Sequence, residues 1–98
     1  MDIKFADDDY ERLETDASFD MHFSEAIVRS YRKKLQFLRG ANSIQDVYGF
    51  KSLHCEKLKG ARQGQYSIRL NDQYRLIFEI VEDKECPCLK IIHIEDYH

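Results

Sequence analysis

The sequence lacks the features that would place it in a membrane, in an export pathway or among low-complexity proteins. None of its apolar runs approaches the length of a membrane span. No signal peptide is evident, because Met1 is followed by Asp2 and acids crowd the next ten positions. Repeats and linkers are also absent. At 98 residues, 43% of them hydrophobic, we expect a single cytoplasmic domain over residues 1–98 with its own core.

Cysteine is scarce as well, and the three present do not form a disulfide framework. Cys55, Cys86 and Cys88 are odd in number, which indicates reduced thiols in the cytoplasm. Cys86-Pro87-Cys88 is a C-x-C motif, and zinc would need further ligands, for which His93 and His98 are the only nearby candidates. We therefore expect a turn between two strands here, with no metal and no cofactor.

The chain as a whole has no excess of basic residues, since its net charge is −3. The charges are nevertheless unevenly distributed. Residues 1–25 carry 9 acids and 2 bases, residues 26–75 carry 3 acids and 11 bases, and residues 76–98 carry 6 acids and 2 bases. A basic middle region between acidic ends suggests a polyanionic partner such as RNA.

The first residues predict a strand followed by a short helix. Ile3 and Phe5 alternate with polar residues over Asp2–Ala6, as in a half-buried strand. Asp7-Asp8-Asp9 then provides capping groups and favourable charge for the first turn of a helix. The buried side of this helix would comprise Tyr10 and Leu13.

A longer helix is predicted over Met21–Arg39, with Gly40 as its C-terminal stop. One further helical turn is expected over Ser43–Val47, with Ser43 as its cap. The apolar stripe of the long helix comprises Ile27, Val28, Tyr31, Leu35 and Leu38. Basic residues off this stripe, which form either a solvated face or a contact with an acidic partner or RNA, are Arg29, Arg32, Lys33 and Lys34.

The second half of the chain has the pattern of strands. The last of them is apolar on both faces, as is typical of a central strand. Because helices come first and an antiparallel sheet second, the predicted class is α+β, with N-terminal helices packed on a small, mostly antiparallel twisted sheet. The predicted strands are Leu53–Lys59, Gln65–Leu70, Gln73–Glu82 and Cys88–Glu95.

The two middle strands form a hairpin around which the chain is organised. Tyr74, Leu76 and Phe78 alternate with polar or charged positions such as Arg75, and Asn71-Asp72 supplies a turn in which both residues tolerate positive φ. Basic residues stand on or beside the hairpin at regular intervals, so we expect a cationic sheet face that holds phosphates. These residues are Lys57, Lys59, Arg62, Arg69 and Arg75.

Four motifs of this half resemble those of the HigB-like branch of the RelE/ParE toxin superfamily. In chain order they are Leu58-Lys59-Gly60, Gly64-Gln65-Tyr66-Ser67-Ile68, Asn71-Asp72-Gln73-Tyr74-Arg75 and Asp96-Tyr97-His98. The N-terminal half matches that branch only in its order of elements. The resemblance implies a RelE/ParE-like fold and a type II toxin that cleaves mRNA on the ribosome without a metal ion.

The residue types in these motifs fit that chemistry. Attack of a ribose 2′-OH on the adjacent phosphate needs cations beside the phosphate and groups that pass protons. Lys59 and Arg75 supply positive charge, His98 titrates near neutrality, Tyr97 stacks on a base or joins proton transfer, and Asp96 orients a neighbour or takes the 2′-OH proton. The remaining basic residues, which we expect to bind RNA, are Lys57, Arg62 and Arg69.

One position departs from the pattern of the branch, some of whose members carry a histidine three residues before the lysine of L-K-G. In this sequence that position is Glu56, and the nearest histidine is His54. On the predicted strand these two residues share a face, so a bulge would let His54 serve in the site. The alternative is an exposed strand histidine without a role, and the choice between His54 and Glu56 stays open.

The resemblance also implies partners: a cognate helix-turn-helix antitoxin of the HigA type, the ribosome and mRNA, with operator DNA bound only through the antitoxin complex. Two other functions compete. One is a ParE-like toxin without nuclease activity that acts on DNA gyrase, and the other is a binding module of an autorepressor complex. At the residue level, Arg75 could pair with Glu79, Lys59 could be a surface lysine, and Asp96-Tyr97-His98 could be a frayed end.

Overall fold

The computed structural model describes residues 1–82 and 88–96. Predictions for Cys86-Pro87, Tyr97 and His98 therefore lie outside the described residues. In chain order the elements are β1 (Asp2–Phe5), α1 (Asp8–Thr15), α2 (Glu25–Gly40), α3 (Ile44–Gly49), the 3-10 turn η1 (Lys51–Leu53), β2 (Glu56–Lys57), the 3-10 turn η2 (Gly60–Arg62), β3 (Gln65–Arg69), β4 (Tyr74–Val81) and β5 (Cys88–Asp96).

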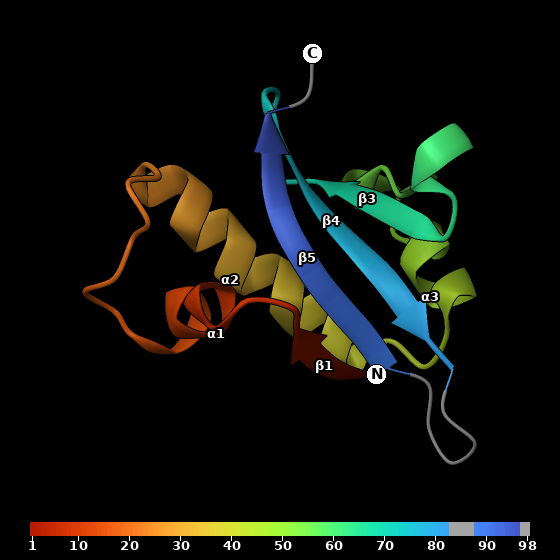
Figure 1. The fold of residues 1–98 in the computed structure, drawn as a ribbon, viewed down its shortest axis with the longest axis horizontal. Helices are drawn as coiled ribbons and strands as arrows, with labels where there is room; N and C mark the ends of the chain where they lie inside the picture. Colours follow the sequence, from red (N-terminus) through yellow and green to blue (C-terminus); the bar gives the residue numbers. More distant parts are fainter. Residues whose placement is uncertain (83–87, 97–98) are drawn as a thin grey trace.

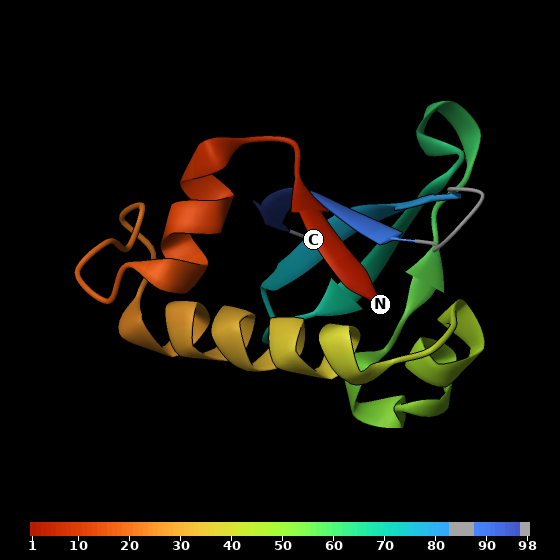
Figure 2. The ribbon, with the colours of Figure 1, turned by 90° about the horizontal axis from the view of Figure 1, so that it is seen from below.

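The described strands form one five-stranded sheet in the order β1-β5-β4-β3-β2. Only β1 and β5 run parallel, and the other neighbours are antiparallel. The long helix α2 runs along one face of this sheet, while α1 lies beside α2 and β1 (Figures 1 and 2). The predicted α+β class and the mostly antiparallel sheet are confirmed.

Side-chain caps fix where the helices begin. Asp7 accepts a hydrogen bond from the backbone N–H of Asp9 at 2.9 Å and starts α1, as predicted. The predicted start of the long helix at Met21 is wrong, because Met21 has a φ of 52° and Ser24 caps α2. Gly40 is the last residue of α2 rather than a stop beyond it. The predicted apolar stripe is confirmed, since all five of its side chains are buried.

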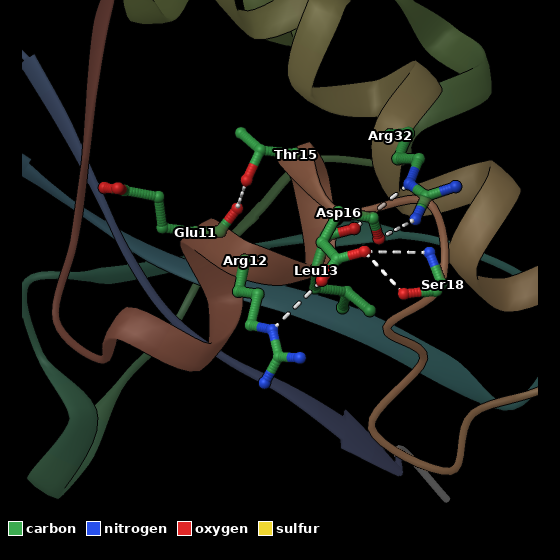
Figure 3. Close-up of polar contacts among 7 residues, drawn as sticks. All are labelled: Glu11, Arg12, Leu13, Thr15, Asp16, Ser18 and Arg32. Atoms are coloured by element: carbon green, nitrogen blue, oxygen red, sulfur yellow. Dashed lines mark hydrogen bonds and ion pairs between the residues drawn. The ribbon is translucent and has the colours of Figure 1, made fainter.

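Hydrogen bonds from Arg32 of α2 connect this helix to the C-terminal end of α1. The guanidinium of Arg32 donates to the backbone carbonyls of Leu13 and Asp16, each at 3.0 Å (Figure 3). The carboxylate of Asp16 in turn accepts from the N–H and hydroxyl of Ser18 at 3.0 and 2.7 Å. Carbonyls left open at the end of a short helix are thus satisfied by a side chain of its neighbour.

The first predicted strand of the hairpin region is mostly wrong. Leu53 ends the 3-10 turn η1 and is buried, and its N–H bonds to the carbonyl of Phe50 at 3.0 Å. His54 follows with a φ of 47°, in the left-handed region. Backbone groups before β2 therefore bond within local turns instead of a ladder, and only Glu56–Lys57 pairs as a strand.

The hairpin itself is confirmed, but its turn is held differently from the prediction. Neither Asn71 nor Asp72 has a positive φ. Instead, the side-chain Oδ1 of Asn71 accepts from the N–H groups of Gln73 and Tyr74 at 2.8 and 2.7 Å. Asparagine closes the turn with its side chain, which removes the need for a left-handed backbone.

The strand β5 contains a bulge at its two adjacent isoleucines, Ile91 and Ile92. Ile77 of β4 pairs with His93, whereas the next residue, Phe78, pairs with Ile91, so Ile92 has no partner on β4. The extra residue shifts the alternation, and Ile91 and Ile94 both join the core under α2. As predicted, β5 has neighbours on both sides.

We predict that Tyr10→Phe will destabilise the fold by about 1–3 kcal/mol, because a buried backbone donor would lose its partner. The hydroxyl of Tyr10 accepts from the N–H of Ile94 at 3.1 Å, and burial raises the pKa of this phenol. Urea unfolding followed by circular dichroism measures the change. The matched control is Tyr48→Phe, since Tyr48 is 46% exposed. Equal stabilities of the two variants would contradict the prediction.

Candidate active site

The sheet face turned away from α2, here called the outer face, carries most of the polar residues of the hairpin. In β4, Leu76 and Phe78 belong to the core under α2, so Arg75 and Ile77 point to the outer face. Residues opposite a given position share its face. The pairing therefore adds the following to the outer face: Ser67, Arg69, His93 and Glu95.

Arg75 is fixed at the base of the outer face. It is only 8% exposed, and its Nε donates to the hydroxyl of Ser67 at 2.9 Å. Its Nη2 donates to the carbonyl of His54 and, at 3.4 Å, to that of Ser67. A guanidinium stays protonated in a protein, so these contacts hold a permanent positive charge in one orientation.

A cleft of about 270 Å³ opens beside this guanidinium. Glu56 reaches it because Glu56 pairs with Ser67 and therefore lies on the outer face. His54 reaches it from the left-handed residue after η1, not from a strand. The prediction that His54 and Glu56 share a strand face is wrong, yet both residues line the cleft. The full lining is His54, Glu56, Arg69, Asn71, Asp72 and Arg75.

The three residues predicted to bind RNA lie in different places. Arg69 is opposite Arg75 and lines the cleft, where its guanidinium forms an ion pair with Asp72. Lys57 pairs with Tyr66, whose ring packs on the core under α2, so Lys57 lies on the other face of the sheet. The structure thus separates Lys57 from the cleft and places Arg69 within it.

Lys59 and Arg62 belong to the loop around η2, which rises on the side of the sheet away from α2 (Figure 2). The positive φ of Gly60 and Gly64, 67° and 93°, is a conformation that favours glycine, so these residues shape the loop. Lys59 is exposed at the start of η2 and lines a shallow depression of about 300 Å³ instead of the cleft.

Arg62 is tied to β5 by a carboxylate that sequence reasoning missed. Its Nη1 lies 2.7 Å from Oε2 of Glu95, whose Oε1 is 3.1 Å from Nε2 of His93. The hydrogen bond from Arg62 holds the pKa of Glu95 below its usual range, while burial opposes this shift. Glu95 therefore links the loop that carries Lys59 to the strand next to Arg75.

Asp96 ends β5 opposite Tyr74, so the alternation places it on the side of Tyr74 and not on the outer face. Its Oδ2 accepts from the side-chain amide of Gln73 at 3.0 Å. Tyr97 and His98, the other two members of the predicted motif, lie outside the described residues. The structure thus brings Arg75, Arg69 and His54 together and keeps Asp96 at the adjacent turn.

Sequence reasoning also missed Ser67, which orients Arg75. The predicted pairing of the two hairpin strands could have identified it. A small polar residue of β3 that points to the outer face can reach an arginine of β4 that points to the same face. Within residues 1–82 and 88–96, no group of three or more His, Cys, Asp or Glu could hold a metal ion. Likewise, none of the helices there is long and apolar enough to cross a membrane.

Chemically, the cleft combines a fixed cation with a carboxylate and an imidazole. Arg75 can stabilise negative charge on a phosphate, and Glu56 or His54 can accept a proton from a neighbouring hydroxyl. These are the groups that transesterification of a phosphodiester requires. The ion pair between Arg69 and Asp72 supplies a second guanidinium at the rim.

Comparison with known proteins agrees with this geometry. The matching family model is the HigB-like toxin, described as the RelE-like toxin HigB of a type II toxin–antitoxin system, and it covers residues 3–91. Comparison with curated protein sequences gives no match.

Among solved structures, YafQ from E. coli matches with a TM-score of 0.61 at 14% identity, over 97% of this chain and 91% of that chain. The YoeB–YefM complex from Staphylococcus aureus matches with a TM-score of 0.59 at 24% identity, over 100% and 97%. A YoeB/ParE toxin from Agrobacterium tumefaciens matches with a TM-score of 0.58 at 16% identity, over the full length of both chains. These likenesses show the fold.

Proposed function

The chain belongs to the HigB-like family of RelE-like type II toxins, and from this premise we propose that it is an endoribonuclease that cleaves mRNA on the ribosome without a metal ion. The family consists of toxins with mRNA-cleaving activity. The observation that supports this function best is the orientation of Arg75 by Ser67 in a cleft that Glu56 and His54 share.

In the proposed reaction, the 2′-oxygen of the ribose attacks phosphorus, an O2′–P bond forms and the P–O5′ bond breaks. Glu56 or His54 removes the 2′-OH proton, and Arg75 stabilises the charge that develops on the phosphate oxygens. We assign protonation of the departing 5′-oxygen to His98 and stacking on a base to Tyr97, since the resemblance implies that both positions line the site. The products are a 2′,3′-cyclic phosphate and a free 5′-hydroxyl.

The predicted basic residues then take different parts. Arg69 contacts RNA at the rim of the cleft once a phosphate replaces Asp72 as its partner. Lys59 approaches the phosphate from the loop of η2, and Arg62 positions that loop through Glu95. Lys57, on the other face of the sheet, is assigned no contact with the RNA in the cleft.

The proposed partner is a helix-turn-helix antitoxin of the HigA type that neutralises the toxin and carries it to operator DNA. Solved structures that resemble this chain include complexes of a YoeB toxin with its YefM antitoxin, which supports an antitoxin partner of some type. Since mRNA and ribosomes are the proposed targets, the cytoplasm is the proposed site of action.

A direct test incubates the purified chain with ribosomes programmed with a defined mRNA and maps the new RNA ends. We expect cuts within the mRNA that leave 2′,3′-cyclic phosphate ends, and little cleavage when ribosomes are omitted. A parallel supercoiling assay with DNA gyrase tests the ParE-like alternative. Inhibition of gyrase with intact mRNA would overturn the proposal.

Glu95→Gln should lower the cleavage rate at saturating substrate by about 10- to 100-fold with little change in KM, because the variant releases the loop that positions Lys59. The matched control is Glu14→Gln, which breaks a comparable ion pair, with Arg39, between α1 and α2. Arg62→Lys should retain more activity than Arg62→Ala. A Glu95→Gln variant as fast as the control would show that the pair has no positioning role.

A further inference from the structure

Three aromatic side chains are exposed around the end of α2 and around α3. They are Phe37, Tyr48 and Phe50, with exposed fractions of 37%, 46% and 43%. The rings of Phe37 and Phe50 lie 5.3 Å apart and are tilted by 57°. Contiguous exposed apolar surface of this kind usually marks a contact with another molecule.

The Phe37–Phe50 pair forms one wall of a groove of about 360 Å³, whose remaining lining is Lys33, Gln36 and Gly40. Lys33, Phe37 and Gly40 share one side of α2, since they follow at helical spacing. Gly40 leaves the groove open: a Cβ added there would meet no atom within 4 Å. This set of five residues is called the aromatic groove below.

The surroundings of the aromatic groove are basic. Residues 26–45 contain five bases and no acid. Three of the bases have partners within the fold: Arg29 pairs with Glu25, Arg39 pairs with Glu14, and Arg32 donates to backbone carbonyls.

Lys33 and Lys34 have no hydrogen bond or ion pair to any described residue. Burial is the main cause that lowers the pKa of Lys34, and the charges of Lys33 and Arg69 add to it. An aromatic groove that is lined by the uncompensated Lys33, with Lys34 next to it in the chain, is complementary to a segment with large apolar side chains flanked by acids.

We propose that the aromatic groove is the docking site of the antitoxin, which inserts an apolar side chain between Phe37 and Phe50 and places acidic residues against Lys33 and Lys34. The partner's identity rests on the proposed function, whereas the groove and its charge do not. The aromatic groove shares no lining residue with the cleft that holds Arg75, and α2 and α3 lie on the side of the sheet opposite the outer face (Figure 2).

Charge and shape favour this occupant over two others. In a two-fold symmetric dimer, a second copy of the chain would bring Lys33 and Lys34 of each molecule against a surface that is equally basic. Single-stranded RNA is usually bound by open aromatic ring faces and a row of cations. The groove has one lysine in its lining and two rings tilted against each other.

The test uses two variants that leave the core intact, the double variant Phe37→Ser/Phe50→Ser and Gly40→Glu, which puts a carboxylate into the groove. The control is Val81→Ser, because Val81 is also exposed but lies at the end of β4. The probe is the antitoxin produced from the neighbouring reading frame. Binding is measured by calorimetry, and growth is followed with and without co-expression of the antitoxin.

We expect both variants to bind the antitoxin roughly thirtyfold more weakly or worse, as at an interface hot spot, and to arrest growth even when the antitoxin is present. Cleavage of mRNA should equal that of the wild type. Wild-type affinity in both variants would overturn the proposal. Loss of mRNA cleavage in variants that bind the antitoxin normally would also overturn it and would assign the groove to ribosomal RNA. A wild-type dimer that dissociates in the double variant would overturn it as well and would assign the groove to a second copy of the chain.

The docking proposal and the proposed function fail in different ways. If the wild type binds the antitoxin through the groove but cuts no mRNA, the nuclease proposal fails and the docking site stands. If the wild type cuts mRNA and both variants are still neutralised, the docking site fails and the nuclease proposal stands.

Discussion

Arg75→Ala should cut ribosome-bound mRNA roughly 10²–10³ times more slowly than the wild type, which is the usual effect of removing one preorganised donor to a transition-state charge. The effect should be large because the structure holds this guanidinium in one orientation with Ser67 and the carbonyl of His54. No solvent rearrangement is then needed as charge grows on the phosphate.

Two further variants separate charge from orientation. Arg75→Lys keeps the positive charge but loses the planar fork, so it should recover only a small part of the rate. Ser67→Ala keeps the arginine and removes the hydroxyl that orients it, so its cleavage rate should lie between those of Arg75→Ala and the wild type.

Because Arg75→Ala also removes a donor from the hydroxyl of Ser67 and from the carbonyls of His54 and Ser67, the folded fraction must be measured by circular dichroism and used to correct the rate. A corrected rate within a factor of about three of the wild type would show that Arg75 does not act on the phosphate, since the predicted loss is far larger.

Glu56→Gln should lower the cleavage rate by about 10²–10⁴, the usual contribution of a general base, if the carboxylate takes the 2′-OH proton. His54→Gln is the matched comparison, because both residues line the cleft and neither substitution empties it. We expect the larger loss at Glu56. It extends from β2 opposite Ser67, on the face that carries Arg75.

The comparison has a clear opposite outcome. A large loss in His54→Gln with little change in Glu56→Gln would assign the proton to the imidazole. The backbone carbonyl that His54 offers to Arg75 is kept in His54→Gln, so a structural effect through that carbonyl is held constant.

The sequence was sufficient for those parts of the molecule that depend on periodicity. The apolar stripe of α2, the hairpin of β3 and β4 and the side of Arg75 on β4 all follow from spacing of two or 3.6 residues. Arg75 was predicted from a motif of the resemblance, and Arg69 from the regular spacing of basic residues on the hairpin.

The features that could not be predicted depend on specific hydrogen bonds and ion pairs, which the periodicity of the sequence does not report. Ser24 caps α2, which begins at Glu25, four residues after Met21, because the hydroxyl of Ser24 accepts from the N–H of Ile27 at 3.3 Å. Leu53 and His54 fit the alternation of a strand, but their N–H groups bond to the carbonyls of Phe50 and Lys51 within a local turn. The contact between Arg62 and Glu95 joins residues 33 apart, and no spacing rule in the sequence reports it.

The unpaired Ile92 of β5 has a consequence for how chains of this fold can vary in length. Before Ile92, Leu89 and Ile91 of β5 point into the core, and after it Ile94 does. Each half of β5 therefore pairs with β4 in a regular alternation. A chain one residue shorter at this point would keep every side chain on its present face. It would lose only the extra twist that a bulge adds, which sets the direction in which His93 and Glu95 project. The loss of one residue at position 92 would thus change the direction of the outer-face side chains while the hydrophobic core stays unchanged.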